Sequence, residues 1–501
     1  MSISLKMAGQ SGFFLIGNIF TLIVGFVFQI YLARVLGAEG LGVFGLLESG
    51  VGVFTALLGL GIAQTVMRYI PEHLKKHEFG KVHALVSKGF TILAIFGTAG
   101  LVVCMVAIPQ IVSWQPELWG YRIEVMVAAM LIPIGLLHFY SSQVLRGFQD
   151  IRHIVVGTAF LQLSVKCLLA VVLIGLGYSV LGYLWAVILA SLAALAWMFI
   201  GIRKHLGQTP REESQGLPVL SEWRGYAQVM YGNNLLNFWS APLDRFVVGY
   251  VAGAGAVGVL IIAKTLYSLP GIFLQMFLSI VAPMMSSAHA GDNQDEVQKI
   301  YHLCTDWLVR LSLPLVIFLI IFAEPVLLQF GNSFAIQGVL ILQILLIAQL
   351  FSLICGPIGN VLNMCGLEKQ MFRISITSTV AGAVILIIGV YFWGLPGVGI
   401  SVLFSVVYSN LYALSVARKE LGFYWSDARY IQWILPLTVS VIAALLLSAY
   451  VAGPVQLIGS LVVVYIAFHS CQLLVHGLGD EDREIITAIR QKLFGHIGEK
   501  K

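Results

Sequence analysis

Apolar residues form long, nearly uninterrupted runs along the whole chain, and short charged segments separate these runs. Most runs reach about 18 residues or more, which lets a helix cross a hydrocarbon core of roughly 30 Å. The strict alternation of apolar and polar residues that barrel strands require does not appear. The pattern therefore predicts an all-α polytopic membrane protein.

Fourteen membrane-spanning helices are predicted from these runs, with short loops between them. The composition agrees, because 59% of the 501 residues are hydrophobic, only 11% are charged, and the mean hydropathy is +0.91. The predicted spans are 12–33, 42–66, 84–110, 122–145, 154–176, 179–202, 226–251, 257–284, 303–323, 335–362, 372–393, 396–417, 431–451 and 454–475.

The distribution of Lys and Arg predicts the orientation of the spans. If the N-terminus is cytoplasmic, 24 of the 29 Lys and Arg residues lie in segments assigned inside or at the inner ends of spans. Of the rest, only Arg34 and Arg122 lie on the outer side. This asymmetry follows the positive-inside rule and predicts a multi-pass protein of the cytoplasmic (inner) membrane with both termini cytoplasmic. The net charge of +5 then reflects orientation, and we expect no nucleic-acid partner.

An internal repeat is visible in the spacing of small residues. The segment VLGAEGLGVFGLLE at 35–48 resembles VAGAGAVGVLIIAK at 251–264, with Val, Gly, Ala, Gly and Val coinciding at an offset of 216. Pro109 and Pro325 keep the same offset. A constant register over a long distance indicates a duplicated unit.

The repeat predicts the domain organisation. We expect an N-terminal six-helix lobe at 1–220, a C-terminal six-helix lobe at 221–420, and two extra transmembrane helices with a cytoplasmic tail at 421–501. Because each lobe holds an even number of spans, an approximate two-fold axis along the membrane normal relates them. A central cavity between the lobes is the expected consequence.

Glu48 and Lys264 are opposite charges at equivalent positions of the repeat, since 264 minus 48 is 216. Related positions at one depth can face each other across a central cavity. We therefore predict that Glu48 lies in a watered cleft with Lys264 opposite.

Three further charges lie inside predicted spans, namely Lys166 and the adjacent Asp244 and Arg245. Adjacent side chains point about 100° apart on a helix, so Asp244 and Arg245 each need another partner. Pro242 is expected to kink the same span. An intramembrane charge costs roughly 3 kcal/mol at the bilayer centre, so these groups should face the protein interior. The predicted substrate-binding residues, with Arg34 at the outer end of its span, are Arg34, Glu48, Lys166, Asp244, Arg245 and Lys264.

An alternative interpretation is that these charges form salt bridges between helices and bind no ligand. Arg34 alone would then be an interfacial anchor.

Nothing in the sequence indicates catalysis or a metal centre. The GxGxxG match GAGAVG at 253–258 joins two predicted spans and follows no strand. His138 and His469 are isolated in spans, where hydrogen-bonded interior histidines are the usual case. The six cysteines lie in or beside apolar runs without a CxxC pair. We expect a protein that is not an enzyme and has no cofactor.

Several segments resemble the polysaccharide transporter family, the O-antigen-flippase-like members of the multidrug/oligosaccharidyl-lipid/polysaccharide exporter superfamily. The resemblance covers essentially the whole chain. It is carried by YLARVLGAEGLGVFGL at 31–46, GLGIAQTVMRYIPEH at 59–73, LDRFVVGYVAGAGAVGVL at 243–260, GDNQDEVQKIY at 291–301 and GNVLNMCGLEKQMFR at 359–373.

The resemblance implies two six-helix lobes around a central cavity, and alternating access. The implied substrate is a polyprenyl-diphosphate-linked oligosaccharide, moved from the inner to the outer leaflet for surface polysaccharide biosynthesis. A diphosphate needs cations, which Arg34, Lys166, Arg245 and Lys264 can supply. Glu48 and Asp244 would hold those cations in the empty state or bind a coupling ion, either a proton or sodium.

Two related functions remain as alternatives. A peptidoglycan-precursor flippase has the same fold and span number, whereas a cation-coupled multidrug exporter of the superfamily usually has twelve spans. Lipid-linked oligosaccharide and membrane lipid are the expected partners. The sequence leaves open which glycan is carried, and whether a polysaccharide polymerase or a glycosyltransferase associates with the protein.

Overall fold

The computed structural model describes residues 3–114, 116–210, 223–228, 230–232, 242–291, 293–424, 428–451, 453–477 and 483. Regular structure within these residues is helical throughout, which confirms the all-α prediction. Among the described residues, twelve helices are long and apolar enough to span a membrane, or thirteen if the bent pair Gly271–Leu278 and Val281–Ala290 counts as one span.

The chain divides into two compact units. Unit 1 comprises Met1–Ile261 and Leu386–Leu395, and unit 2 comprises Ile262–Ile385 and Pro396–Lys501. The predicted lobe boundaries at 220 and 420 rest on the repeat, and they stay a prediction.

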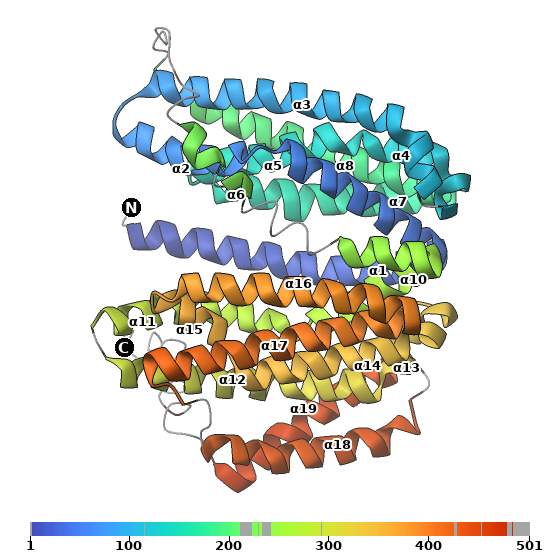
Figure 1. Ribbon diagram of the computed structural model, residues 1–501, viewed down its shortest axis with the longest axis vertical. Coiled ribbons are helices and arrows are strands. Elements are labelled where there is room, and N and C mark those ends of the chain that lie inside the picture. Colours follow the sequence, from blue (N-terminus) through green and yellow to red (C-terminus); the bar gives the residue numbers. More distant parts are fainter. Residues whose placement is uncertain are drawn as a thin grey trace, which may run out of the picture. The chain divides into compact units, whose positions relative to one another are not determined.

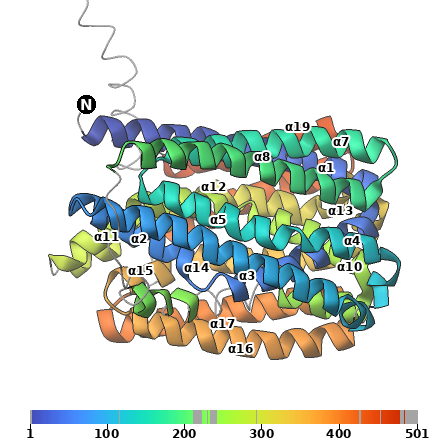
Figure 2. The same ribbon diagram turned by 90° about the horizontal axis from the view of Figure 1, so that it is seen from above.

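Unit 1 contains the helical elements α1 to α8 with η1 and η2, the helical residues 223–228 and 230–232, and the first part of α10. Figures 1 and 2 show its long helices α3, α5 and α8 running side by side. The element bounds are α1 Ile3–Leu58, α2 Ile62–Lys75, α3 Phe79–Trp114, η1 Pro116–Tyr121, α4 Arg122–Ala129, α5 Leu131–Gly147, α6 Ile151–Val155, the π-helical η2 Val156–Gln162, α7 Leu163–Gly175, α8 Ser179–Gly207 and α10 Leu243–Ser268.

Unit 2 begins within α10 and contains most of the remaining helices, with α12 and α14 packed along each other (Figure 1). The last turns of α16 belong to unit 1. The element bounds are α11 Gly271–Ala290, α12 Gln294–Ile321, α13 Ala323–Leu328, α14 Asn332–Cys355, α15 Ile358–Met364, α16 Glu368–Trp393, α17 Leu395–Leu421, η3 Ala428–Trp433, α18 Ile434–Ser448 and α19 Pro454–His476.

α1 consists of two spans joined at a glycine. Its apolar part, Phe13–Leu58, has 46 residues, more than twice the roughly 20 that one span needs. Gly37 interrupts the helix with φ 68° and ψ −179°, a conformation that residues with a Cβ rarely adopt. The described residues hold twelve or thirteen candidate spans, so the fourteen spans of the sequence pattern stay a prediction.

α10 repeats this break. Gly253, 216 residues after Gly37, has φ 85° and ψ 171° inside the helix. Two glycines with positive φ that are 217 residues apart, Gly177 and Gly394, also precede α8 and α17. The register seen in the sequence therefore coincides with positions where the backbone leaves helical geometry.

A buried tyrosine joins α5 to α3 in unit 1. Tyr140 is fully buried, and its hydroxyl donates a hydrogen bond to the Leu85 carbonyl at 2.9 Å. A Cβ at Gly89 would lie 2.0 Å from the Tyr140 oxygen, so only glycine leaves room for the phenol. The hydrogen bond of the buried hydroxyl stabilises this contact by about 1 kcal/mol, in addition to the stabilisation from burial of the ring.

An aspartate on α12 connects the C-terminal helices to the core of unit 2. Asp306 is 3% exposed, accepts a hydrogen bond from Trp433 Nε1 at 2.8 Å, and pairs with Arg310 Nη2 at 2.7 Å. Tyr465 of α19 donates a hydrogen bond to the Leu311 carbonyl at 2.8 Å. The two helices beyond the repeat are thus fastened to α12 by specific polar contacts as well as by apolar packing.

Candidate functional site

α1 and α10 pack backbone against backbone at two glycines of unit 1. A Cβ added at Gly42 would lie 1.7 Å from the Ala254 carbonyl oxygen, and one added at Gly258 would lie 1.9 Å from the Ala38 oxygen. Each glycine follows an alanine by four residues, the small-residue spacing that lets membrane helices approach closely. The contact is reciprocal, because Gly258 and Ala254 follow Gly42 and Ala38, respectively, by 216 residues.

This close approach brings Arg245 of α10 against α1. Its Nη1 donates to Glu48 Oε2 at 3.0 Å, to Ser49 Oγ at 3.2 Å and to the Gly45 carbonyl at 3.4 Å. The Glu48 side chain is 58% exposed, whereas that of Arg245 is 28% exposed. Glu48 therefore has a cationic partner inside unit 1 and still presents much of its carboxylate to the surroundings.

Asp244 and Arg245 do not pair through their side chains, as expected for adjacent helical residues. Asp244 is 5% exposed, and its Oδ1 accepts a hydrogen bond from the Arg245 backbone N–H at 2.7 Å. Pro242 immediately precedes α10. The predicted kink at Pro242 is not tested, because residues 233–241 lie outside the described part of the chain.

A cavity of about 650 Å³ lies within unit 1 and includes Glu48 in its lining. Its walls come from α1, α2, α3, α5, η2 and α8, and they are largely apolar, with aromatic side chains at Phe44 and Phe139. A volume of this order with a few convergent polar groups is typical of ligand sites. The polar residues of the lining are Glu48, Thr55, Gln64, His138, Gln162 and Ser191.

His138 and Gln162 are site residues that sequence reasoning missed. His138 Nε2 is buried without a hydrogen-bond partner among the described residues, contrary to the expectation of a hydrogen-bonded interior histidine. Gln162 ends the π-helix η2 and donates from Nε2 to Ser191 Oγ at 3.1 Å. Both residues are isolated polar positions in apolar spans, and this is the one sequence signal that marks them. For Gln162 there is a structural signal as well, because single π-turns in helices often accompany functional sites.

Three predicted residues remain, namely Lys166, Arg34 and Lys264. Lys166 of α7 lies over the Phe28 ring, with Nζ 5.9 Å from the centroid, and among the described residues no ion pair joins it to Glu48. Arg34 is exposed on α1. Lys264 belongs to unit 2, so its predicted pairing with Glu48 stays a prediction.

No group of three or more His, Cys, Asp or Glu side chains within the described ranges is arranged to hold a metal ion.

Solved structures with a similar fold are membrane transporters. The lipid II flippase MurJ in an inward closed conformation aligns with a TM-score of 0.70 and 14% identity, over 94% of this chain and 99% of MurJ. An inward-facing multidrug resistance MATE family transporter of the MOP superfamily aligns with a TM-score of 0.66 and 16% identity, over 80% of this chain and 94% of that one. A MOP superfamily transporter from Pyrococcus furiosus, described as having a binding pocket of reversed polarity, aligns with a TM-score of 0.54 and 15% identity, over 81% and 93%.

Sequence comparison gives the family. No curated protein matches the chain significantly. The profile of the family MatE matches residues 230–388, and that of the family Polysacc_synt, described as polysaccharide biosynthesis protein, matches residues 9–289. Because the second match covers more than half of the chain, this protein belongs to the polysaccharide biosynthesis protein family, and it is a multi-pass membrane protein with the fold of the transporters above.

Proposed function

We propose that this protein is a flippase that moves a polyprenyl-diphosphate-linked oligosaccharide across the cytoplasmic membrane by alternating access, for surface polysaccharide biosynthesis. The observation that carries the proposal is the cavity of about 650 Å³ in unit 1. Its amide, hydroxyl and imidazole groups are donors and acceptors of the kind that bind the many hydroxyls of a sugar. Phe44 and Phe139 add apolar faces against which sugar rings can pack.

Arg245 is the residue best placed to receive phosphate in unit 1. Its contacts to Glu48, Ser49 and the Gly45 carbonyl all involve Nη1. A guanidinium carries five N–H donors and binds phosphate oxygens in pairs, so the other nitrogens remain to bind a diphosphate. Glu48 then orients the guanidinium while no substrate is bound.

The test is a deletion strain complemented with variants. We expect loss of the protein to stop surface glycan export while lipid-linked oligosaccharide accumulates in the cytoplasmic leaflet. Arg245→Gln and Gln162→Ala should reproduce both effects in part at normal membrane levels. Glu368→Gln is the control, because Glu368 is exposed in the first turn of α16 and lies outside the cavity. Normal glycan export in the deletion strain would overturn the proposal.

A peptidoglycan-precursor flippase is the second candidate, because the fold aligns with that of a lipid II flippase over 94% of the chain. In that case the deletion strain would accumulate lipid-linked peptidoglycan precursor and keep its surface glycan. Altered drug efflux with both lipid-linked pools unchanged would instead identify a cation-coupled multidrug exporter.

We also propose that both termini lie in the cytoplasm, as the distribution of Lys and Arg predicts. A cysteine replacing exposed Gly120, between α3 and α4, should then react with an impermeant reagent from outside. A cysteine replacing Lys75, at the end of α2, should react only after permeabilisation. The reverse pattern would contradict this topology.

A further inference from the structure

A second cavity in unit 1, of about 530 Å³, lies apart from the candidate site. The helical residues 223–228 and 230–232, together called the covering segment, lie over this cavity and contact the break between α1 and α2. Tyr231 donates a hydrogen bond to the Leu57 carbonyl at 3.0 Å, and a Cβ at Gly61 would lie 2.1 Å from the Ala227 carbonyl oxygen. The covering segment therefore contacts both the last turn of α1 and the break that follows it.

Aromatic contacts fix the start of this segment on α2. Trp223 is 5% exposed and lies with its ring centroid 6.1 Å from Tyr69 and 5.8 Å from His73. The Arg68 guanidinium lies over the Tyr226 ring at 4.4 Å. A wall built from packed rings is rigid enough to keep a cavity open.

The cavity is amphipathic. Its apolar lining includes Leu60, Ile62 and Ile92, whereas two exposed cations, Lys88 of α3 and Arg224 of the covering segment, belong to the same lining. Neither cation has an acidic partner within the part of the chain that the structure describes. Two cations that have no acidic partner among the described residues, beside an apolar wall, match a ligand with an anionic head and a hydrocarbon chain.

An unpartnered donor independently indicates a ligand. Trp223 lines this cavity, and its Nε1 is buried without an acceptor among the described residues. A buried N–H without a partner costs about 1–3 kcal/mol, so such groups normally have an acceptor. The oxygen atoms of a phosphate or ester group would supply one.

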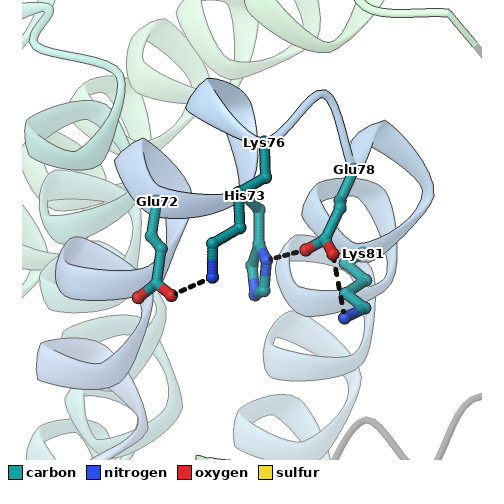
Figure 3. A network of polar contacts seen from close by, with 5 residues as sticks. All are labelled: Glu72, His73, Lys76, Glu78 and Lys81. Atoms are coloured by element: carbon teal, nitrogen blue, oxygen red, sulfur yellow. Dashed lines mark hydrogen bonds and ion pairs between the residues drawn. The ribbon is translucent and has the colours of Figure 1, made fainter.

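The acidic side chains of the adjacent α2–α3 corner are occupied by other partners (Figure 3). Lys76 Nζ lies 2.7 Å from Glu72, and Glu78 lies 2.7 Å from His73 Nδ1 and 3.3 Å from Lys81 Nζ. These hydrogen bonds, from Lys76 and His73 respectively, hold the pKa of Glu72 and of Glu78 below the usual range. Both carboxylates are thus ionised near neutral pH and engaged locally, which leaves Lys88 and Arg224 for an external anion.

We propose that the cavity between α2, α3 and the covering segment binds an anionic glycerophospholipid, with its head-group phosphate at Lys88 and Arg224 and an acyl chain along Leu60, Ile62 and Ile92. The positive-inside pattern assigns both cations to the cytoplasmic side, where anionic lipids attract basic side chains. A cavity of about 530 Å³ suits one head group and part of a chain. Its lining shares no residue with that of the proposed transport cavity, so the two sites are distinct.

Native mass spectrometry of the purified full-length protein tests this site with three added lipids: phosphatidylglycerol, phosphatidylcholine and undecaprenyl phosphate. We expect wild-type protein to retain phosphatidylglycerol about tenfold more strongly than phosphatidylcholine, as one lost charge-assisted contact implies. The Lys88→Gln/Arg224→Gln variant should lose this preference, and the charge-conserving Lys88→Arg/Arg224→Lys variant should keep it. Lys75→Gln is the matched control, because Lys75 is an exposed cation at the end of α2 that does not line the cavity.

Equal retention of phosphatidylglycerol by wild type and the doubly neutralised variant would overturn the site. Preference for undecaprenyl phosphate with no retention of phosphatidylglycerol would show that the ligand of this cavity is not a glycerophospholipid. If the neutralised variant fails to fold, a photoreactive phosphatidylglycerol on wild-type protein should cross-link to peptides containing 85–92 or 223–228. Cross-links confined to other peptides would refute the proposal.

Discussion

Gly42 and Gly258 occupy equivalent positions of a repeat and face each other's helices in the same way. Each lies against the backbone of the partner helix, with the oxygens of Ala254 and Ala38 at the place where a Cβ would be. A two-fold-related contact therefore exists between the second arms of α1 and α10, inside unit 1. Arg245 reaches Glu48 because these backbones lie so close together.

Adding one methyl group at this contact should separate the helices. We expect Gly42→Ala to destabilise the protein by about 1–3 kcal/mol, because the obstructing atoms are backbone and cannot rotate away. Gly50→Ala on the same helix should be neutral or stabilising, since a Cβ there meets nothing within 4 Å and alanine favours helices. Thermal unfolding in detergent measures both variants. A similar loss at Gly50 would show that the effect is not specific to the contact.

The ion pair between Glu48 and Arg245 should contribute little to stability. The Glu48 side chain is 58% exposed, and exposed ion pairs are typically worth about 0.2–1 kcal/mol. A double-mutant cycle with Glu48→Gln and Arg245→Gln should give a coupling energy in this range, measured by unfolding. The same variants should impair glycan export more strongly than they lower stability. A coupling of several kcal/mol, with export unaffected, would identify the pair as structural only.

His138 and Tyr140, two residues apart on α5, should behave in opposite ways. His138→Leu should leave stability nearly unchanged, because it removes a buried nitrogen without a partner among the described residues, yet it should impair export. Tyr140→Phe should lower stability by about 1 kcal/mol and leave export intact, because its hydroxyl serves the contact with α3. Unfolding and glycan export, measured on both variants, decide this. Loss of export in Tyr140→Phe alone would show that Tyr140, and not His138, serves transport.

Asp150 should make unit 1 sensitive to acid. Its carboxylate caps α6 by accepting from the His153 N–H at 3.1 Å, and Oδ2 lies 2.7 Å from His153 Nδ1 and from His205 Nε2. Burial raises the pKa of Asp150, but the hydrogen bonds with His205 and His153 lower it by more. The pKa of Asp150 in the folded protein therefore lies below the usual 3.8. A lowered folded-state pKa stabilises the protein above the unfolded-state pKa, and this stabilisation is lost as the pH falls through the folded-state value.

Melting temperature measured from pH 6 down to about pH 3 tests this expectation. Wild-type protein should lose stability below about pH 4, and Asp150→Asn should remove much of that dependence while lowering stability at neutral pH. Asp295→Asn is the control, because Asp295 is exposed in the first turn of α12. An unchanged acid dependence in Asp150→Asn would rule out this carboxylate as its source.

The sequence by itself determined the helices, because a backbone crossing a hydrocarbon core must satisfy its hydrogen bonds within its own segment. It also revealed the repeat, and the coinciding glycines and alanine proved structurally meaningful. Gly37 and Gly253 are the two breaks, while Gly42 and Gly258 lie in the reciprocal contact. Such constraints are local, since each depends on a single backbone angle or on the absence of one side chain.

Only the tertiary structure decided which charges meet. The sequence marked Glu48 as needing a cation and proposed Lys264 from the repeat, whereas within unit 1 the partner is Arg245. Likewise, nothing in the local pattern placed His138 in a cavity with Glu48. The partner of a polar side chain depends on which helices are neighbours and on the rotation of each about its axis. Contacts among residues far apart in the chain set both, so no single segment encodes them.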